Sequence, residues 1–164
     1  METLVLGLGN ILLGDDGVGV RAVERLQALY DLPEDLRVLD GGTLGLDLLP
    51  YVEDADRLLL IDAVQAGQEP GTPLRLEGEE VPAFLAVKLS PHQMALPDLL
   101  AAARLRGRYP SEVVLWGVQP GPMTTTLDLS PPVAAQVDAL VDRLLADLGR
   151  WGFELTRRLD HEQQ

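Results

Sequence analysis

The sequence predicts a single α/β domain spanning residues 1–164, in which a mostly parallel twisted sheet has helices on both faces. Apolar runs typical of strands alternate with segments of helical periodicity, which is the pattern of an α/β fold. A length of 164 residues is expected for one domain. With 46% hydrophobic and only 4% aromatic residues, we expect an aliphatic core.

The chain begins with a predicted strand, a tight glycine loop and a helix. The strand is the apolar run at residues 4–8, and the helix shows apolar residues at helical spacing. These are Val18, Ala22, Leu26 and Leu29. Asp15 and Asp16 stand where the helix begins, and one of them is expected to cap it. Because two residues cannot cap the same end, the other carboxylate is free to point over the end of the sheet.

The middle of the chain carries three more strand-like runs. Residues 37–40 and 58–64 are predicted strands, with a short helix at residues 46–52 between them. Residues 73–76 alternate in polarity and follow a connection too short for a helical crossover, so they predict one antiparallel edge strand. Residues 77–82 are acidic and are expected to be irregular.

The next helix has a well-defined predicted start and end. Ser90 suits the cap position, Pro91 the first helical position and Gln93 the third position after the cap. The helical pattern continues until Gly107, a residue typical of helix ends.

One more strand and one more helix complete the predicted fold. The strand covers residues 113–116, and the helix runs from a cap at Ser130 to Gly149 with one apolar face. Residues 150–164 are polar, and we expect this tail to fray.

The charge and the lack of cysteine exclude several classes of function. A net charge of −13 and a pI near 4.4 argue against nucleic acid and anionic membrane surfaces, and favour a basic or neutral protein partner. Without cysteine there is no disulfide, thiolate metal site or cysteine nucleophile. We find no leader peptide and no membrane-length apolar run, so we expect a cytoplasmic protein with no membrane partner.

The glycine loop does not match a nucleotide site. Leu12 stands where the third glycine of a dinucleotide fingerprint belongs, and no Gly-Lys-Ser/Thr sequence occurs. Asp15 and Asp16 would repel a phosphate.

Protease arrangements based on serine or paired aspartates are also disfavoured. Ser90 lacks a nucleophile-elbow motif, and adjacency in sequence does not bring two carboxyl groups face to face.

Three acidic residues are predicted at the carboxyl ends of parallel strands, where ligands bind in such sheets. Asp16 follows the first strand, Asp40 ends the second and Asp62 lies near the end of the third. Burying Asp62 in an apolar strand is costly unless the carboxylate has a partner. That partner is either a ligand or a loop amide in a purely structural role.

His92 is the only histidine outside the tail, which carries His161. In the first turn of a predicted helix the helix dipole favours the neutral imidazole, the form that binds metals. Asp16, Asp62 and His92 would together make a three-ligand site with open positions. Such nitrogen and oxygen ligands suit nickel, zinc, cobalt or manganese.

The opening motif, Gly7-Leu8-Gly9-Asn10 followed by Asp15-Asp16-Gly17-Val18-Gly19, resembles that of the [NiFe] hydrogenase maturation endopeptidases. Members of this family remove a C-terminal extension from the hydrogenase large subunit. Five further blocks resemble the family's motifs in the right order. They are Asp40-Gly41-Gly42-Thr43, Asp62-Ala63, Ser90-Pro91-His92-Gln93, Gly117-Val118-Gln119-Pro120 and Leu129-Ser130-Pro131.

The resemblance implies a function and a site. It implies a hydrogenase large-subunit precursor as substrate and partner, with the nickel already inserted in that precursor as the recognition element. Zinc or another divalent ion is able to replace the nickel. Asp16, Asp62 and His92 are the implied metal-binding and catalytic residues, and Asp40 has a supporting role. The family often has glutamate in place of Asp16, so this shorter side chain reaches the metal either directly or through water.

Three other interpretations stay open. The same three ligands would serve a non-enzymatic chaperone that inspects the nickel site. They would also serve a conventional metallohydrolase with its own zinc, although no His-x-x-x-His pair is present. The third is an α/β domain whose acids are structural, and the six ordered blocks argue against it.

Overall fold

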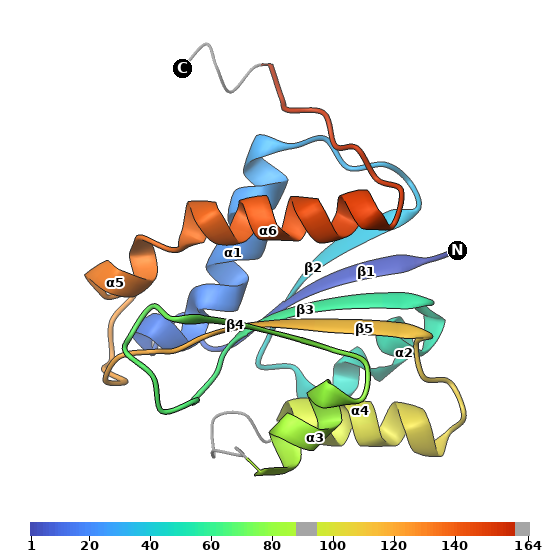
Figure 1. The fold of residues 1–164 in the computed structure, drawn as a ribbon, viewed down its shortest axis with the longest axis horizontal. Helices are drawn as coiled ribbons and strands as arrows, with labels where there is room; N and C mark the ends of the chain where they lie inside the picture. The colour runs from blue at the N-terminus through green and yellow to red at the C-terminus, as the bar shows by residue number, and fades with distance from the viewer. Residues whose placement is uncertain (88–94, 160–164) are drawn as a thin grey trace.

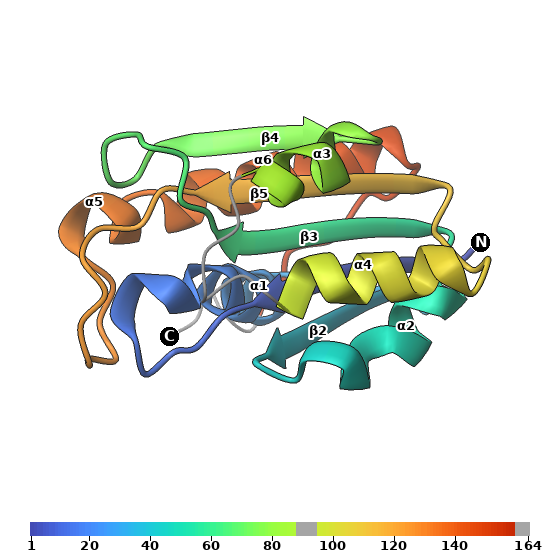
Figure 2. The same ribbon diagram turned by 90° about the horizontal axis from the view of Figure 1, so that it is seen from below.

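A five-stranded sheet forms the centre of the protein in a computed structural model that describes residues 1–87 and 95–159. Neighbouring strands are parallel except for the last pair, so the predicted mostly parallel sheet with one antiparallel edge strand is confirmed. The order across the sheet is β2-β1-β3-β5-β4 (Figure 2). In chain order the strands are β1 (Thr3–Leu8), β2 (Leu36–Gly42), β3 (Arg57–Ala63), β4 (Pro73–Glu77) and β5 (Glu112–Val118).

Helices cover both faces of this sheet, as the sequence predicted (Figure 1). On one face lie α1 (Val18–Leu29) and α6 (Val137–Arg150). On the other lie α2 (Leu49–Asp54), α3 (Glu80–Val87) and α4 (Ala95–Leu105). Three short helical segments are also present, namely the 3-10 helices η1 (Gly14–Gly17) and η2 (Gly45–Leu48) and the α-helix α5 (Pro131–Ala134).

The core consists of two aliphatic layers, one on each face of the sheet. Side chains alternate along a strand, so Leu58 and Leu60 face α4 while Leu59 and Ile61 face α1. All four are buried, which explains why β3 reads as a continuous apolar run rather than an alternating one. The burial on both faces fixes the end of β3, where Asp62 lies.

Two predictions about helices are wrong. Residues expected to be irregular belong in part to α3, in which Pro82 occupies the third position and therefore blocks no intrahelical hydrogen bond. The single last helix is interrupted after Ala134, which gives the separate helices α5 and α6. Gly149 lies inside α6 and does not end it.

The structure describes only part of two predicted segments, the helix that starts at Ser90 and the tail at residues 150–164. The predicted helix start at Ser90, Pro91 and Gln93 lies outside the described residues. In the predicted frayed tail, the Thr156 carbonyl accepts a hydrogen bond from the Asp31 N–H at 2.9 Å, and the Arg158 N–H donates to the carbonyl at the end of α1 at 2.8 Å. Across residues 1–87 and 95–159, no helix has the length and apolar character needed to cross a membrane.

Candidate functional site

The candidate site lies where the sheet reverses its strand order. From β1 the chain goes to β2 on one side and then crosses to β3 on the other. The connections leave in opposite directions at the carboxyl ends of β1 and β3, and this is where open α/β sheets bind ligands. Asp16 comes from the loop after β1, and Asp62 is the sixth residue of β3. Both line one narrow cavity of about 90 Å³.

Two glycines allow these elements to approach. Gly9 has a φ of 119°, and a Cβ there would overlap the backbone carbonyl oxygen of Asp16. A Cβ at Gly19 would overlap the carbonyl oxygen of Ile61. The glycines therefore let β1, the acidic loop and α1 close tightly around the end of β3. This close packing explains why the loop is rich in glycine.

Asp16 and Asp62 are both almost completely buried, with exposed fractions of 4% and 5%. The N–H of Asn10 donates to Oδ2 of Asp16 at 2.8 Å, and the N–H of Ala63 donates to Oδ1 of Asp62 at 2.8 Å. Within the described part of the chain, the second oxygen of each carboxylate has no hydrogen-bond partner. Each residue therefore keeps one oxygen for a ligand in the cavity.

The electrostatics of the cavity favour a cation. Burial raises the pKa of Asp62 well above its ordinary value, and the negative charge of Asp16 raises it further, while the Ala63 hydrogen bond opposes the rise. A bound cation would stabilise both carboxylates in their charged form. The pair of carboxylate oxygens thus fits a divalent metal.

The third predicted ligand, His92, lies outside the described residues. In residues 1–87 and 95–159, no group of three or more histidine, cysteine or acidic side chains could hold a metal by itself. Leu96 and Leu99 of α4 line the cavity, together with Leu48. These apolar walls were not predicted as part of the site, because in the sequence they are indistinguishable from ordinary core residues of amphipathic helices.

Asp15 has a different role from its neighbour, and the expectation that one of the pair caps the helix is wrong. Neither η1 nor α1 has a side-chain cap. The Asp15 carboxylate instead accepts hydrogen bonds from the N–H of Gly121 at 2.8 Å and from the N–H and Oγ of Ser130, both at 2.7 Å. It ties two points of the distant loop between β5 and α5 to the start of α1.

Asp40 lies beside the cavity and not in it. It is exposed at the end of β2 and lines a neighbouring open groove of about 290 Å³. The groove and the cavity share Gly9, Gly42 and Thr43. The structure therefore brings Asp16 and Asp62 together and leaves Asp40 at the adjacent surface.

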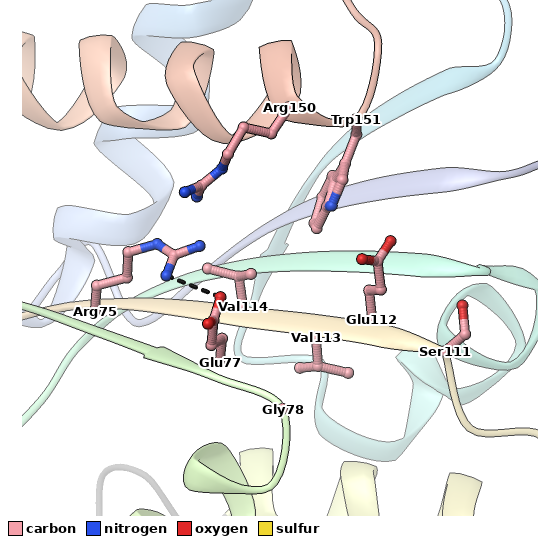
Figure 3. A pocket seen from close by; sticks show the side chains of 9 residues that line it. All are labelled: Arg75, Glu77, Gly78, Ser111, Glu112, Val113, Val114, Arg150 and Trp151. Carbon is pink, nitrogen blue, oxygen red and sulfur yellow. Dashed lines mark hydrogen bonds and ion pairs between the residues drawn. The ribbon is translucent and has the colours of Figure 1, made fainter.

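A larger cavity, of about 490 Å³, lies at the opposite end of β5 (Figure 3). Arg75 and Arg150 point into it, but Asp147 forms ion pairs with both, and Arg75 also pairs with Glu77 at 3.0 Å. Trp116 donates a further hydrogen bond to Asp147 at 2.6 Å. These charges compensate one another, so the cluster joins β4, β5 and α6 and does not present a free charge to a ligand.

The fold and the site define an α/β protein with a buried pair of carboxylates at its switch point. The chain belongs to the hydrogenase maturation protease family, whose model matches residues 20–147. It is an endopeptidase and hence a hydrolase, which confirms the predicted family and enzyme class.

Individual relatives match over nearly the whole chain. Hydrogenase 2 maturation protease of Escherichia coli (strain K12) is 42% identical over 159 residues, which cover 96% of this chain and 97% of the relative. The hydrogenase expression/formation protein HupD of Rhodobacter capsulatus is 44% identical over 158 residues, covering 95% and 75%. The solved structure of the hydrogenase maturating endopeptidase HybD from E. coli superimposes with a TM-score of 0.92 at 42% identity, covering 98% and 99%.

Proposed function

We propose that this endopeptidase removes the C-terminal extension of a nickel-loaded hydrogenase large-subunit precursor. The observation that supports the proposal is the buried pair of carboxylates at the switch point of the sheet, each with one oxygen that has no hydrogen-bond partner in residues 1–87 and 95–159. A relative named Hydrogenase 2 maturation protease is consistent with a hydrogenase as the substrate.

In this proposal the nickel arrives as part of the substrate. Asp16 and Asp62 bind it with their available oxygens, His92 is the third ligand, and Asp40 has a supporting role. Zinc or another divalent ion is able to replace the nickel. A metal held this way polarises the peptide carbonyl or a bound water and so favours hydrolysis. The apolar walls formed by Leu48, Leu96 and Leu99 keep bulk water out, which strengthens electrostatic interactions inside the cavity.

Mass spectrometry of the precursor, incubated with the protein with and without nickel loading, tests this function. We expect loss of a C-terminal fragment from the nickel-loaded form alone. Asp16→Asn and Asp62→Asn should lower the cleavage rate by at least about 100-fold, the scale expected when a metal site is disrupted. Asp128→Asn is the matched control, since Asp128 is exposed and its carboxylate has no partner among the described residues.

Other outcomes would favour the competing functions. Binding of the precursor without loss of mass would indicate a chaperone that inspects the nickel site. Cleavage regardless of nickel, stoichiometric zinc in the purified protein and inhibition by a chelator before substrate is added would indicate a conventional metallohydrolase. Full activity of His92→Ala on the nickel-loaded precursor would remove the histidine from the mechanism. The cytoplasmic location expected from the sequence stays a prediction.

A further inference from the structure

We propose that the open groove beside the cavity binds an extended segment of the substrate polypeptide through one cationic and one apolar side chain. We call it the Asp40 groove; it is lined by residues 9–12, by Val20, and by Asp40, Gly42 and Thr43. This inference rests on the proposed function, and it assigns Asp40 a substrate-binding role.

The Asp40 groove adjoins the cavity that holds Asp16 and Asp62. Gly9, Gly42 and Thr43 line both spaces. The Gly9 N–H donates to the Gly42 carbonyl at 2.9 Å, so the two loops are joined at the boundary between groove and cavity. A polypeptide lying in the groove would therefore be next to the carboxylate pair.

The groove has an apolar rim. Leu12, Leu44 and Leu46 have exposed fractions of 57%, 56% and 55%, and they belong to the two loops that form or continue its walls. Single exposed leucines are common, but Leu12 lines the groove itself, where an exposed apolar side chain suits a protein partner.

The loops that carry these leucines are held by hydrogen bonds. The Asn10 side chain accepts a bond from the Leu12 N–H at 2.9 Å, and the Leu12 carbonyl accepts one from the Thr126 N–H at 3.0 Å. The Leu44 N–H donates to the Gly41 carbonyl at 3.0 Å. A surface fixed before binding loses less conformational entropy when a partner binds.

The charge of the groove selects the occupant. Asp40 lines the groove and is exposed, and in the described residues its carboxylate has no ion pair or hydrogen bond. Arg21, on the adjoining helix α1, is already bound to Glu24 and to the carbonyl of Leu127. On a chain of net charge −13, this site attracts a positively charged segment and repels an acidic one.

Binding of a nickel-loaded large-subunit precursor to the whole protein tests the inference. Asp40→Lys should weaken binding at least about tenfold at low salt, and the effect should shrink as salt screens the charges. Asp40→Asn and Leu12→Ser should each weaken it severalfold.

The matched controls are Asp35→Lys, at the opposite end of β2, and Leu105→Ser, at the end of α4, since both residues are exposed. Both should bind within about twofold of the wild type. Reversing the charge of the cationic residue that we assign to the bound segment should restore binding to Asp40→Lys. That rescue would not occur if Asp40→Lys merely distorted the loop.

The outcomes separate the groove from the proposed function. If the wild type cleaves and Asp40→Lys binds as tightly as the control Asp35→Lys, the groove assignment is overturned while the function stands. If the wild type binds with the expected Asp40 dependence and does not cleave, the groove stands and the proposed function fails. If the wild type neither binds nor cleaves the precursor, both are overturned.

Discussion

Two neighbouring carboxylates, Asp15 and Asp16, have different roles in this protein. Asp16 points into the cavity, whereas Asp15 accepts three hydrogen bonds from Gly121 and Ser130. The sequence predicted that the two would diverge and that Asp16 would face the sheet end. It could not reveal the partners of Asp15, because they lie more than a hundred residues further along the chain and no local pattern encodes them.

We expect Asp15→Asn to lower the free energy of unfolding by about 2–3 kcal/mol, measured by urea denaturation. The amide loses the negative charge and would place a donor group against the donors of Gly121 and Ser130, and hydrogen bonds to charged groups contribute about 1.5–3 kcal/mol. Asp128→Asn, an exposed change in the same loop region, should stay within about 0.5 kcal/mol of the wild type. A loss below that size for Asp15→Asn would contradict the anchoring role.

Asp62→Asn should make the metal-free protein more stable at neutral pH while abolishing cleavage. The raised pKa of Asp62 means that the folded state prefers the protonated carboxyl, so stability is lost as pH rises from the unfolded pKa through the folded pKa. The asparagine avoids that loss and retains an oxygen for the Ala63 N–H. Each unit of raised pKa corresponds to about 1.4 kcal/mol.

The measurement is the free energy of unfolding of both proteins between acidic and neutral pH. The variant should gain at least about 1 kcal/mol at neutral pH, and the gain should disappear at pH values below the ordinary aspartate pKa. A gain that is independent of pH would show that the stabilisation does not come from the buried charge.

At the scale of elements, the strands were predicted better than the helices. Apolar runs mark β1, β3 and β5, because strands covered on both faces need continuous apolar sequence, whereas alternating polarity marked the edge strand β4. Helix α3 was missed because its first turn contains Glu80 and Pro82, residue types that are common in loops. The break between α5 and α6 was missed because the buried apolar positions Val133, Leu140, Leu144 and Leu148 continue across it, so periodicity does not reveal it.

The packing of α1 on the sheet predicts different effects for two helical glycines. Gly19→Ala would force a Cβ into the carbonyl oxygens of Ile61 and Leu8, so it should destabilise the protein by about 3 kcal/mol or more, within the range of severe overpacking. Gly149→Ala in α6 meets no atom within 4 Å and should stabilise by about 0.5–1 kcal/mol through helix propensity. Thermal unfolding of both variants measures the contrast, and equal effects would contradict the close contact at Gly19.

For the whole molecule, composition and alternation of elements were enough to predict the fold class. The strand order was not accessible, since it is set by long-range pairing between strands such as β3 and β5, which are separated by β4 in the chain. The switch point, and hence the cavity shared by Asp16 and Asp62, follows from that order. Asp40 lies beside this cavity rather than in it. That position depends on how the loops at the end of the sheet fold, which the spacing of residues in the sequence does not specify.

The net charge leads to a prediction about stability and salt. Twenty-six acidic residues against thirteen basic ones leave the folded chain with a charge of −13, and this self-repulsion destabilises the compact state. Raising sodium chloride from about 10 mM to 300 mM shortens the Debye length from roughly 30 Å to below 10 Å. We expect the free energy of unfolding to rise by about 1 kcal/mol, or the unfolding temperature by about 2–4 °C.

Surface ion pairs act in the opposite sense, because salt weakens them. Pairs such as Arg25 with Asp138 are exposed, and each contributes at most about 1 kcal/mol. The excess negative charge acts over the whole surface and should therefore decide the sign. Replacing Asp35 and Asp128 together by lysine changes the net charge by +4. The free energy of unfolding of this variant should therefore depend less on salt. Stability that falls with salt in the wild type would show that the ion pairs outweigh the repulsion.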